Sequence, residues 1–442
     1  MSISGTTNAY GKDMWLRDAV DALERSPGNL YGDLTPQEPI RVEGRNAYFK
    51  VRISDQLGFS IVPENGALGR GNDMVYLEGR LTMARLRETI EMSFDEFEMF
   101  ASYEAGAIPL VTDKMTTAVS TMQRQLSRII WSDGSARLGR CAASAATTVV
   151  NLQVLNGDPG FTAGNQTDRD RFNWLDGQRA RIDIVDATTG VPIANGSNRT
   201  VIAADLVNNT ITLDTTGGNV TTTTSHIIVW AGSVVNGTGA SREFAGMLAA
   251  IADTGTYLGI DRAIAGNSTW KSYVVNGATT GTNELFTTNS WFKLLNRMAR
   301  QHPMGQQPTP DSHTAYSNFG CQAAVVQQLI QGIRYTDNGT PDVGWRVAEL
   351  LGIKWKSDHH APHNNIFLID PRKAGLVKPK NQRFAMLNFL PGAIDGMWNL
   401  ANSATAGQHD ATYIAYMTGL CGLAVTEPMR MGRLNDMTEL GV

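Results

Sequence analysis

The sequence predicts an α+β protein, and three stretches carry that prediction. Residues 112–134 place apolar side chains three and four positions apart, as one face of a buried helix requires. Residues 47–90 alternate apolar and polar residues on both sides of a turn-rich segment, as two antiparallel strands do. Residues 145–239 are rich in Thr, Asn, Gly and Val and alternate over short runs typical of strands.

Size and composition narrow the class of protein. A chain of 442 residues is longer than one hydrophobic core usually holds, so two or three lobes are expected. A composition of 42% hydrophobic and 18% charged residues indicates an ordered globular protein. The formal net charge of -4 argues against a globally basic nucleic-acid binder, although one surface can still carry a nucleic-acid-facing patch. Cys141, Cys321 and Cys421 lie far apart, so they are interpreted as reduced thiols, not as disulfides or a zinc site. The sequence shows neither a membrane-spanning apolar run nor a secretory pattern at its start.

Residues 1–44 are predicted to form an N-terminal arm. A helix over 13–24 is expected, followed by the turn-rich sequence SPGNLYGDLTPQEP. This segment is too short to hold a core of its own, so it should lie on another surface.

Residues 45–92 are predicted to form a long, extended hairpin loop. Each strand would reach roughly 40 to 50 Å at about 3.3 Å per residue. An isolated hairpin is marginally stable in water, and nothing nearby in the sequence supplies a surface, so another subunit is the expected partner. Gly66, Gly69 and Gly71 at its tip are interpreted as turn residues, because phosphate-binding glycine loops join a strand to a helix.

Residues 93–144 should contain a short helix that begins near Phe94 and ends at Gly106, and then the long helix. Thr112 is expected to cap the long helix shortly after Pro109, and Gly134 to close it. The predicted buried face consists of Met115, Ala118, Val119, Met122, Leu126, Ile129 and Ile130.

Residues 145–240 are predicted to form a small β barrel or sandwich inserted in the host domain. Five short strands are expected, over 148–155, 180–186, 201–206, 210–214 and 227–231. A flexible Thr/Asn/Gly loop is the weaker alternative, because the apolar alternation persists throughout.

The remaining chain returns to mixed signals. Residues 241–288 are expected to rejoin the helix-bearing lobe, 289–410 to form a second lobe, and 411–442 to supply a last strand. Within these parts the sequence predicts helices beginning near Asn289 and Asn318, and strands over 353–356, 366–370 and 413–425.

One cluster of histidines suggests a metal-binding site as a hypothesis. His359, His360 and His363, with Asp358 as a fourth group, stand close enough in sequence to share an ion. The cluster falls on a predicted loop between two strands and matches no established zinc pattern, so an ordinary loop is the favoured interpretation.

No catalytic, cofactor-binding or metal-binding residues are predicted. The sequence lacks a GxSxG elbow, a P-loop and a dinucleotide fingerprint, and nothing selects one pair of carboxylates as a glycosidase acid and base. Two interpretations are open for the basic residues on or just after the long helix, Arg124, Arg128, Arg137 and Arg140. They could form a basic stripe, but a solvated helix face with charges near its C-terminal end is the favoured interpretation.

The order of these parts resembles a tailed-bacteriophage major capsid protein of the Hong Kong 97 fold, in a member with an inserted β domain. MVYLEGRLTMARLRETI is similar to the returning strand of the extended loop, and SRIIWSDGSARLGRC to the end of the spine helix. AGMLAAIADTGTYLGIDRA is similar to the return to the peripheral lobe after an insertion. LLGIKWKSDHHAPHNNIFLIDPRKAG resembles the axial strand pair, and CGLAVTEPMRMGRL the final peripheral strand.

The resemblance implies a non-enzymatic shell protein that assembles as hexamers and pentamers into an icosahedral virion around double-stranded DNA, in the host bacterial cytoplasm. It implies portal and possible decoration partners, and a scaffolding protein expected to be separate because the arm begins near residue 1. Lys50 is the hairpin's one lysine and sits near its base, so the covalent crosslinking of some relatives is not carried over. The alternatives are an encapsulin-type shell protein and a carbohydrate-active enzyme with a β accessory module.

Overall fold

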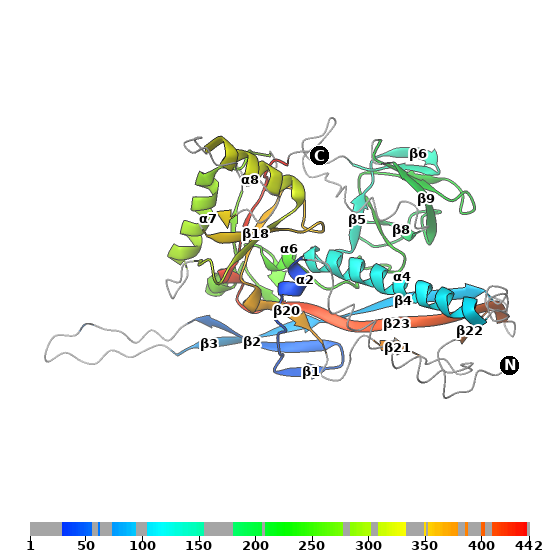
Figure 1. The fold of residues 1–442 in the computed structure, drawn as a ribbon, viewed down its shortest axis with the longest axis horizontal. Helices are drawn as coiled ribbons and strands as arrows, with labels where there is room; N and C mark the ends of the chain where they lie inside the picture. The colour runs from blue at the N-terminus through cyan, green and yellow to red at the C-terminus, as the bar shows by residue number, and fades with distance from the viewer. Residues whose placement is uncertain are drawn as a thin grey trace.

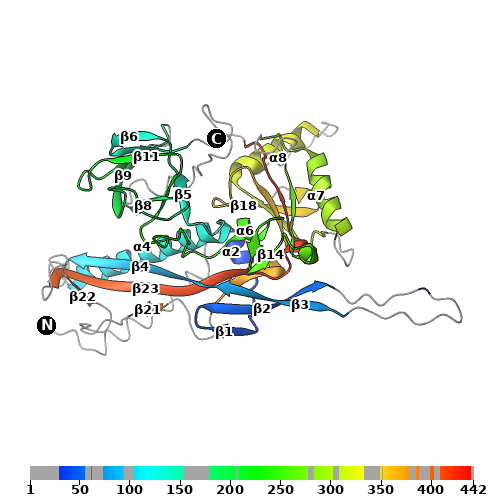
Figure 2. The same cartoon turned by 180° about the vertical axis from the view of Figure 1, so that it is seen from behind.

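The computed structural model describes residues 29–54, 61, 73–93, 104–153, 180–205, 208–276, 283–301, 308–332, 349–350, 352–378, 385–387, 399–402 and 409–439. A long helix, α4, lies along two long strands, β4 and β23, and this elongated unit carries a β-rich lobe and a mixed lobe on the helix side (Figures 1 and 2). None of the helices in these described segments combines the length and apolarity that a bilayer crossing requires.

The spine of the molecule is α4 (Glu104–Trp131), with β4 (Ala84–Ser93) paired antiparallel to β23 (His409–Val425). Its predicted buried face is confirmed wherever side chains are described, namely at Ala118, Val119, Met122, Leu126, Ile129 and Ile130. The predicted start is wrong, because the helix begins eight residues before Thr112 and continues through Pro109. Proline removes one backbone hydrogen bond, and packing of a long helix against a sheet outweighs that local loss.

The hairpin strands are β2 (Asn46–Ser54) and β3 (Val75–Thr82), with β1 (Arg41–Glu43) on the outer edge of β2. The predicted alternation is confirmed, because Phe49, Val51 and Ile53 are buried between exposed polar neighbours. The hairpin was predicted to continue to residue 90, and this is wrong. Pairing with β2 ends at Thr82, after which the chain continues as β4 against β23.

The expectation that the hairpin lacks a surface within its own chain is also wrong for its described part. Arg80 N donates to Leu258 O at 2.8 Å, and Thr269 Oγ1 donates to Ile53 O at 2.5 Å. The buried row of β2 belongs to the same core as Tyr257 and α4. Most of the predicted tip, 55–60 and 62–72, lies outside the described residues.

Short elements complete this main core. They are α2 (Asn29–Asp33), α6 (Met247–Ala250), β13 (Thr256–Tyr257), β14 (Ile260–Asp261), η1 (Ala265–Trp270), η2 (Pro371–Lys373), β20 (Ala374–Val377), β21 (Ala385–Leu387), β22 (Asn399–Asn402) and η3 (Pro428–Arg430). Strands β20, β21 and β22 pair antiparallel with β23. Leu30 and Tyr31 of α2 are buried in this core, so the described end of the predicted arm is part of the fold. The helix expected over 13–24 lies outside the described residues, as does most of the short helix expected from Phe94. The predicted end of that short helix at Gly106 is wrong, because α4 runs through this residue.

The mixed lobe is a six-stranded sheet flanked by two helices. Its order is β15 (Tyr273–Val275), β24 (Gly432–Leu434), β19 (Ile366–Ile369), β16 (Thr314–Ser317), β18 (Ile353–Ser357) and β17 (Glu349–Leu350). The predicted helices exist as α7 (Thr288–Gln301) and α8 (Phe319–Gly332). Asn318 caps α8, accepting from Cys321 N at 2.9 Å. The cap of α7 is Thr287, which accepts from Ser290 N, and not Asn289. Trp291, Trp355 and Phe286 cluster in its core, with ring centroids 5.5 to 6.5 Å apart.

The β-rich lobe contains β5 (Arg137–Arg140), β6 (Ser144–Thr147), β7 (Val149–Asn151), β8 (Arg181–Asp186), β9 (Arg199–Asp205), β10 (Thr210–Leu213), β11 (Val220–Thr222) and β12 (His226–Trp230). Six of them form a sheet in the order β5-β12-β8-β9-β10-β7. Its two ends meet, because Ala142 N donates to Asn151 O at 2.8 Å and Gln153 N to Arg140 O at 3.0 Å. The sheet therefore closes on itself around a separate apolar core that includes Ile182, Ile184 and Ile211.

Each of the five strands predicted for residues 145–240 has an observed counterpart. In the described part of the β-rich lobe, β5, β6 and β11 were not predicted. The sequence SDGSARLGRC, which follows α4, contains β5 after positive φ angles at Gly134 and Ala136. Strands β6 and β11 are four and three residues long, and such short runs lack a recognisable alternation.

Candidate functional site

The histidine cluster is spread among separate interactions. Asp358 accepts from Leu30 N at 3.2 Å and from His360 N at 3.0 Å, so its carboxylate holds a turn and the N-terminal segment together. His359 and His360 meet edge to face, with centroids 5.2 Å apart, while His363 turns to Glu439. Across the described segments, no group of three or more His, Cys, Asp or Glu side chains is placed to hold a metal ion.

Glu439 joins the C-terminal segment to the start of α8. Its carboxylate accepts from His363 Nδ1 at 2.8 Å, from Asn364 N at 2.6 Å and from Asn318 Nδ2, and Cys321 Sγ lies 3.7 Å from it. Burial acts to raise the pKa of Glu439, but the hydrogen bonds and charge of His363 and its neighbours outweigh it, so the pKa lies below its usual value. The arrangement therefore stabilises an ionised, buried carboxylate.

The four arginines do not form a stripe. Arg128 is buried and pairs with Glu243, and its Nε donates to Gln125 Oε1 at 3.1 Å. Arg124 is exposed on α4, whereas Arg137 and Arg140 belong to β5. Neither the basic stripe nor the solvated helix face predicted from the sequence holds for Arg128. This cation faces inward and joins α4 to the chain leaving the β-rich lobe.

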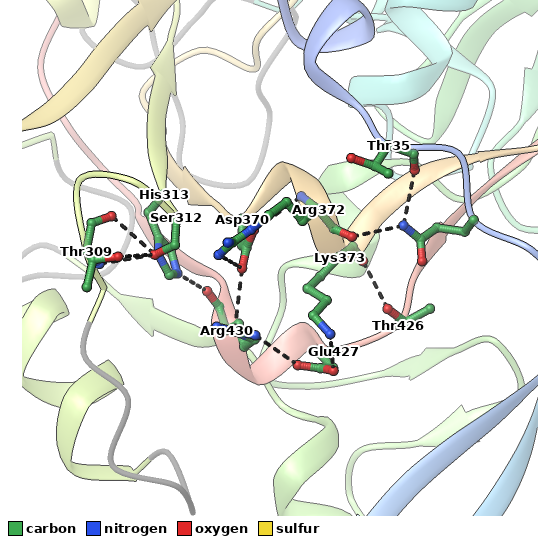
Figure 3. A network of polar contacts seen from close by, with 11 residues as sticks. Thr35, Thr309, Ser312, His313, Asp370, Arg372, Lys373, Thr426, Glu427 and Arg430 are labelled. Atoms are coloured by element: carbon green, nitrogen blue, oxygen red, sulfur yellow. Dashed lines mark hydrogen bonds and ion pairs between the residues drawn. The ribbon is translucent and has the colours of Figure 1, made fainter.

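A polar junction, defined by Thr35, Asp370, Arg372, Glu427 and Arg430, joins the N-terminal segment to η2 and η3 (Figure 3). Asp370 is fully buried and accepts from Arg372 Nε at 3.0 Å, with Arg430 Nε at 3.5 Å. Arg430 also approaches Glu427 at 3.5 Å, and Thr35 N donates to Pro371 O at 3.1 Å. The two carboxylates are thus each neutralised by a cation and are unlike a glycosidase acid–base pair.

Beside this junction, Ser312 and His313 superficially resemble part of a hydrolase triad (Figure 3). Ser312 Oγ lies 2.5 Å from His313 Nδ1, and His313 Nε2 lies 2.9 Å from Arg430 O. A carbonyl accepts only, so Nε2 carries the proton and Nδ1 accepts from the serine. Burial lowers the pKa of His313, which favours this neutral ring. In a triad the ring's second nitrogen contacts a carboxylate, so this geometry is structural.

Arg262 is a second buried cation, and sequence reasoning missed it. Its guanidinium donates to Trp270 O at 3.1 Å, Ala249 O at 3.0 Å, Thr254 O at 3.2 Å and Ala250 O at 2.6 Å. Burial lowers its pKa to about 10, with the charges of Tyr257 and Asp253 opposing that change. The partners are backbone carbonyls 8 to 13 residues away in the chain, and no pattern of residue types identifies a carbonyl as an acceptor. By contrast, Asp370 before Pro371 is a recognisable capping signal in the sequence, and its side chain accepts from Arg372 N.

The comparisons with known sequences give no match. No protein-family model matches the chain, and no curated protein matches it either. The similarity is therefore confined to three-dimensional structure.

A chain of the capsid asymmetric unit of cyanophage A-1(L) superposes with a TM-score of 0.52 at 11% identity, over 94% of this chain and 92% of that chain. This chain has a phage capsid fold. The fold predicted by the resemblance, α+β of the Hong Kong 97 type, is in agreement with it. Lower similarity is found to the capsid of the native GTA particle (TM-score 0.43, 9% identity, 92% and 90% covered) and to the SrpI encapsulin of Synechococcus elongatus PCC 7942 (0.40, 10%, 94% and 89%).

Proposed function

We propose that this chain is the major capsid protein of a tailed double-stranded DNA bacteriophage, and that its function is repeated contact with copies of itself. The observation that carries the proposal is the capsid fold over 94% of the chain. On this proposal the subunits form hexamers and pentamers of an icosahedral shell, located in the virion and assembled in the host cytoplasm. The protein performs no catalysis and needs no cofactor.

The parts of the chain have assigned roles in this proposal. Residues 1–44 are the arm and 45–92 the extended loop; 93–144 and 241–288 form the peripheral domain, 289–410 the axial domain, and 411–442 the last peripheral strand. The structure differs from the proposed last part, 411–442, in two ways. Strand β23 already begins at His409, and β24 pairs with β15 and β19 in the mixed lobe. A separate scaffolding protein, a portal, possible decoration proteins and packaged DNA are the further partners.

Residues 145–240 are proposed to be an inserted, autonomously folding β domain. Its closed sheet and separate core support this, with β5 included in the folding unit. The excised segment 135–242 is expected to give a dispersed amide NMR spectrum with a cooperative thermal transition. A collapsed spectrum from a soluble, monomeric fragment would contradict autonomy.

The hairpin supplies the test of assembly. Removing 58–72 spares the paired bases of β2 and β3, so the subunit should stay soluble and folded while closed shells are lost. Sedimentation velocity and negative-stain microscopy measure assembly, and circular dichroism with a thermal melt measures folding. The matched control replaces the same residues with an equal length of Gly and Ser, which separates loop length from side-chain contacts.

Normal shells from the deletion would contradict the role of the hairpin. A wild-type chain that stays monomeric under every condition, including mixture with phage partner proteins, would contradict the proposed function itself. Shells that enclose protein cargo instead of DNA would identify an encapsulin.

A further inference from the structure

One face of the long sheet is basic although the chain as a whole is acidic. The exposed side chains of β1, β2, β3 and the described part of β4 include six cations, which we call the basic face: Arg41, Lys50, Arg52, Arg80, Arg85 and Arg87. Only two exposed carboxylates, Glu43 and Glu78, accompany them in these described strands. Six cations against two carboxylates leave a net charge of +4 here, compared with -4 for the whole chain.

A local irregularity makes this face continuous from β3 into β4. Leu81, Met83 and Ala84 are buried, so two consecutive residues point inward where the chain passes from β3 to β4. This shift of one residue keeps Arg80 and then Arg85 on the outward side, as a β-bulge does. Met83 N donates to Arg45 O at 2.7 Å, and the Arg45 guanidinium donates back to Met83 O, which fixes the transition.

The face lies on the side of the sheet away from α4 and from both lobes (Figures 1 and 2). Ala84 and Ile90 of β4 point into the core shared with α4, so the alternate residues point the other way. The inserted lobe and the basic face therefore occupy opposite surfaces of the subunit.

Cations and aromatic rings are interleaved on this surface. The Arg41 guanidinium lies 4.3 Å from the centroid of Tyr48, and Lys50 Nζ lies 4.1 Å from that of Tyr76. Arg41 also approaches both carboxylates, at 3.2 Å for Glu78 and 3.6 Å for Glu43. Arg80 and Arg85, by contrast, make no ion pair with any residue in the described ranges. Their charge is the part of the face most available to an anionic partner.

We propose that the basic face contacts the phosphate backbone of double-stranded DNA and marks the inner surface of the shell. This inference rests on the proposed function and extends it by assigning one face to the genome. Six exposed cations along four strands suit a uniformly charged polyanion, and contacts to phosphate carry no base specificity. A protein partner would need carboxylates spaced to match these cations, whereas every phosphate of a duplex offers an equivalent charge.

The test is the salt dependence of DNA binding by the full-length, unassembled subunit. Fluorescence anisotropy with a labelled 30-base-pair duplex between about 30 and 200 mM NaCl gives the slope of log K against log salt concentration. The variant Arg80→Gln with Arg85→Gln should lower the magnitude of that slope by about 2, because each phosphate contact contributes about 0.9. The control Arg181→Gln with Lys354→Gln makes the same charge change at exposed positions in the two lobes and should leave the slope unchanged.

Thermal melts of both variants verify that the fold is retained. Equal slopes in the two variants, or no DNA binding by the wild-type subunit, would overturn the inference. A face variant that binds DNA normally but cannot form shells would also overturn it and assign the face to protein contacts. Because shell formation by the wild type is scored separately, failure of the inference is distinguishable from failure of the proposed function.

Discussion

Replacing Arg262 with Met is expected to destabilise the main core by about 4 kcal/mol. The carbonyl oxygens of Ala249, Thr254 and Trp270 would lose the guanidinium donor, and each unsatisfied buried group costs about 1 to 3 kcal/mol before relaxation. Ala250 O would keep Ser272 Oγ as a donor at 3.3 Å. Met fills a similar volume, so the loss reports hydrogen bonding more than cavity formation. The melting temperature and urea midpoint of the purified subunit measure the effect.

The control for this experiment is Arg242→Met, which removes an exposed arginine from a neighbouring part of the same segment. It should change stability by less than about 0.5 kcal/mol, as exposed substitutions usually do. Equal midpoints for the two variants would mean that the buried guanidinium contributes nothing to the fold.

Replacing Glu439 with Gln is expected to cost about 3 kcal/mol at pH 7.5. His363, Asn364 and Asn318 all donate to the carboxylate of Glu439. The amide of Gln has only one acceptor oxygen, so its NH₂ group would face at least one of these donors and that hydrogen bond would be lost. The C-terminal segment should then separate from the start of α8. Hydrogen exchange at Asn364 and in β24 would locate the change, alongside the shift in unfolding midpoint.

This contribution should depend on pH in one direction. The folded pKa of Glu439 lies below the usual value of 4.5, so the wild type gains stability above that value and loses it as pH falls through the folded pKa. The difference between wild type and Glu439→Gln should therefore shrink as pH falls from 5 toward 3, and Glu78→Gln at an exposed position should show a far smaller difference at every pH. A difference that stays constant over this range would contradict an ionised Glu439.

The candidate site separates into parts that sequence reasoning reached and parts that it missed. The conclusion that His359, His360 and His363 favour a loop agrees with their separate partners, but nothing in the sequence pointed to Glu439 as the partner of His363. Periodicity predicts a surface position for Arg128, because it identifies an apolar helix face and cannot reveal that Glu243, 115 residues later, lies opposite. Strict alternation along a strand would place Arg80 and Arg85 on opposite faces. The two consecutive buried residues, Met83 and Ala84, shift the alternation by one residue, so the sequence pattern does not show that both arginines lie on one face.

The sequence by itself determined the elements whose burial repeats regularly. The face of α4 from Ala118 to Ile130, the inward row of β2 and the strands around Ile182 and Ile211 follow from period and side-chain type, because each buries one side against a core. Only the tertiary structure decided which elements meet. It placed β4 against β23, closed β5 onto the end of β7, and brought Gly432–Leu434 into the mixed lobe. Those pairings join residues far apart in the chain through backbone hydrogen bonds, which are the same for nearly every residue type and so leave no pattern in the sequence.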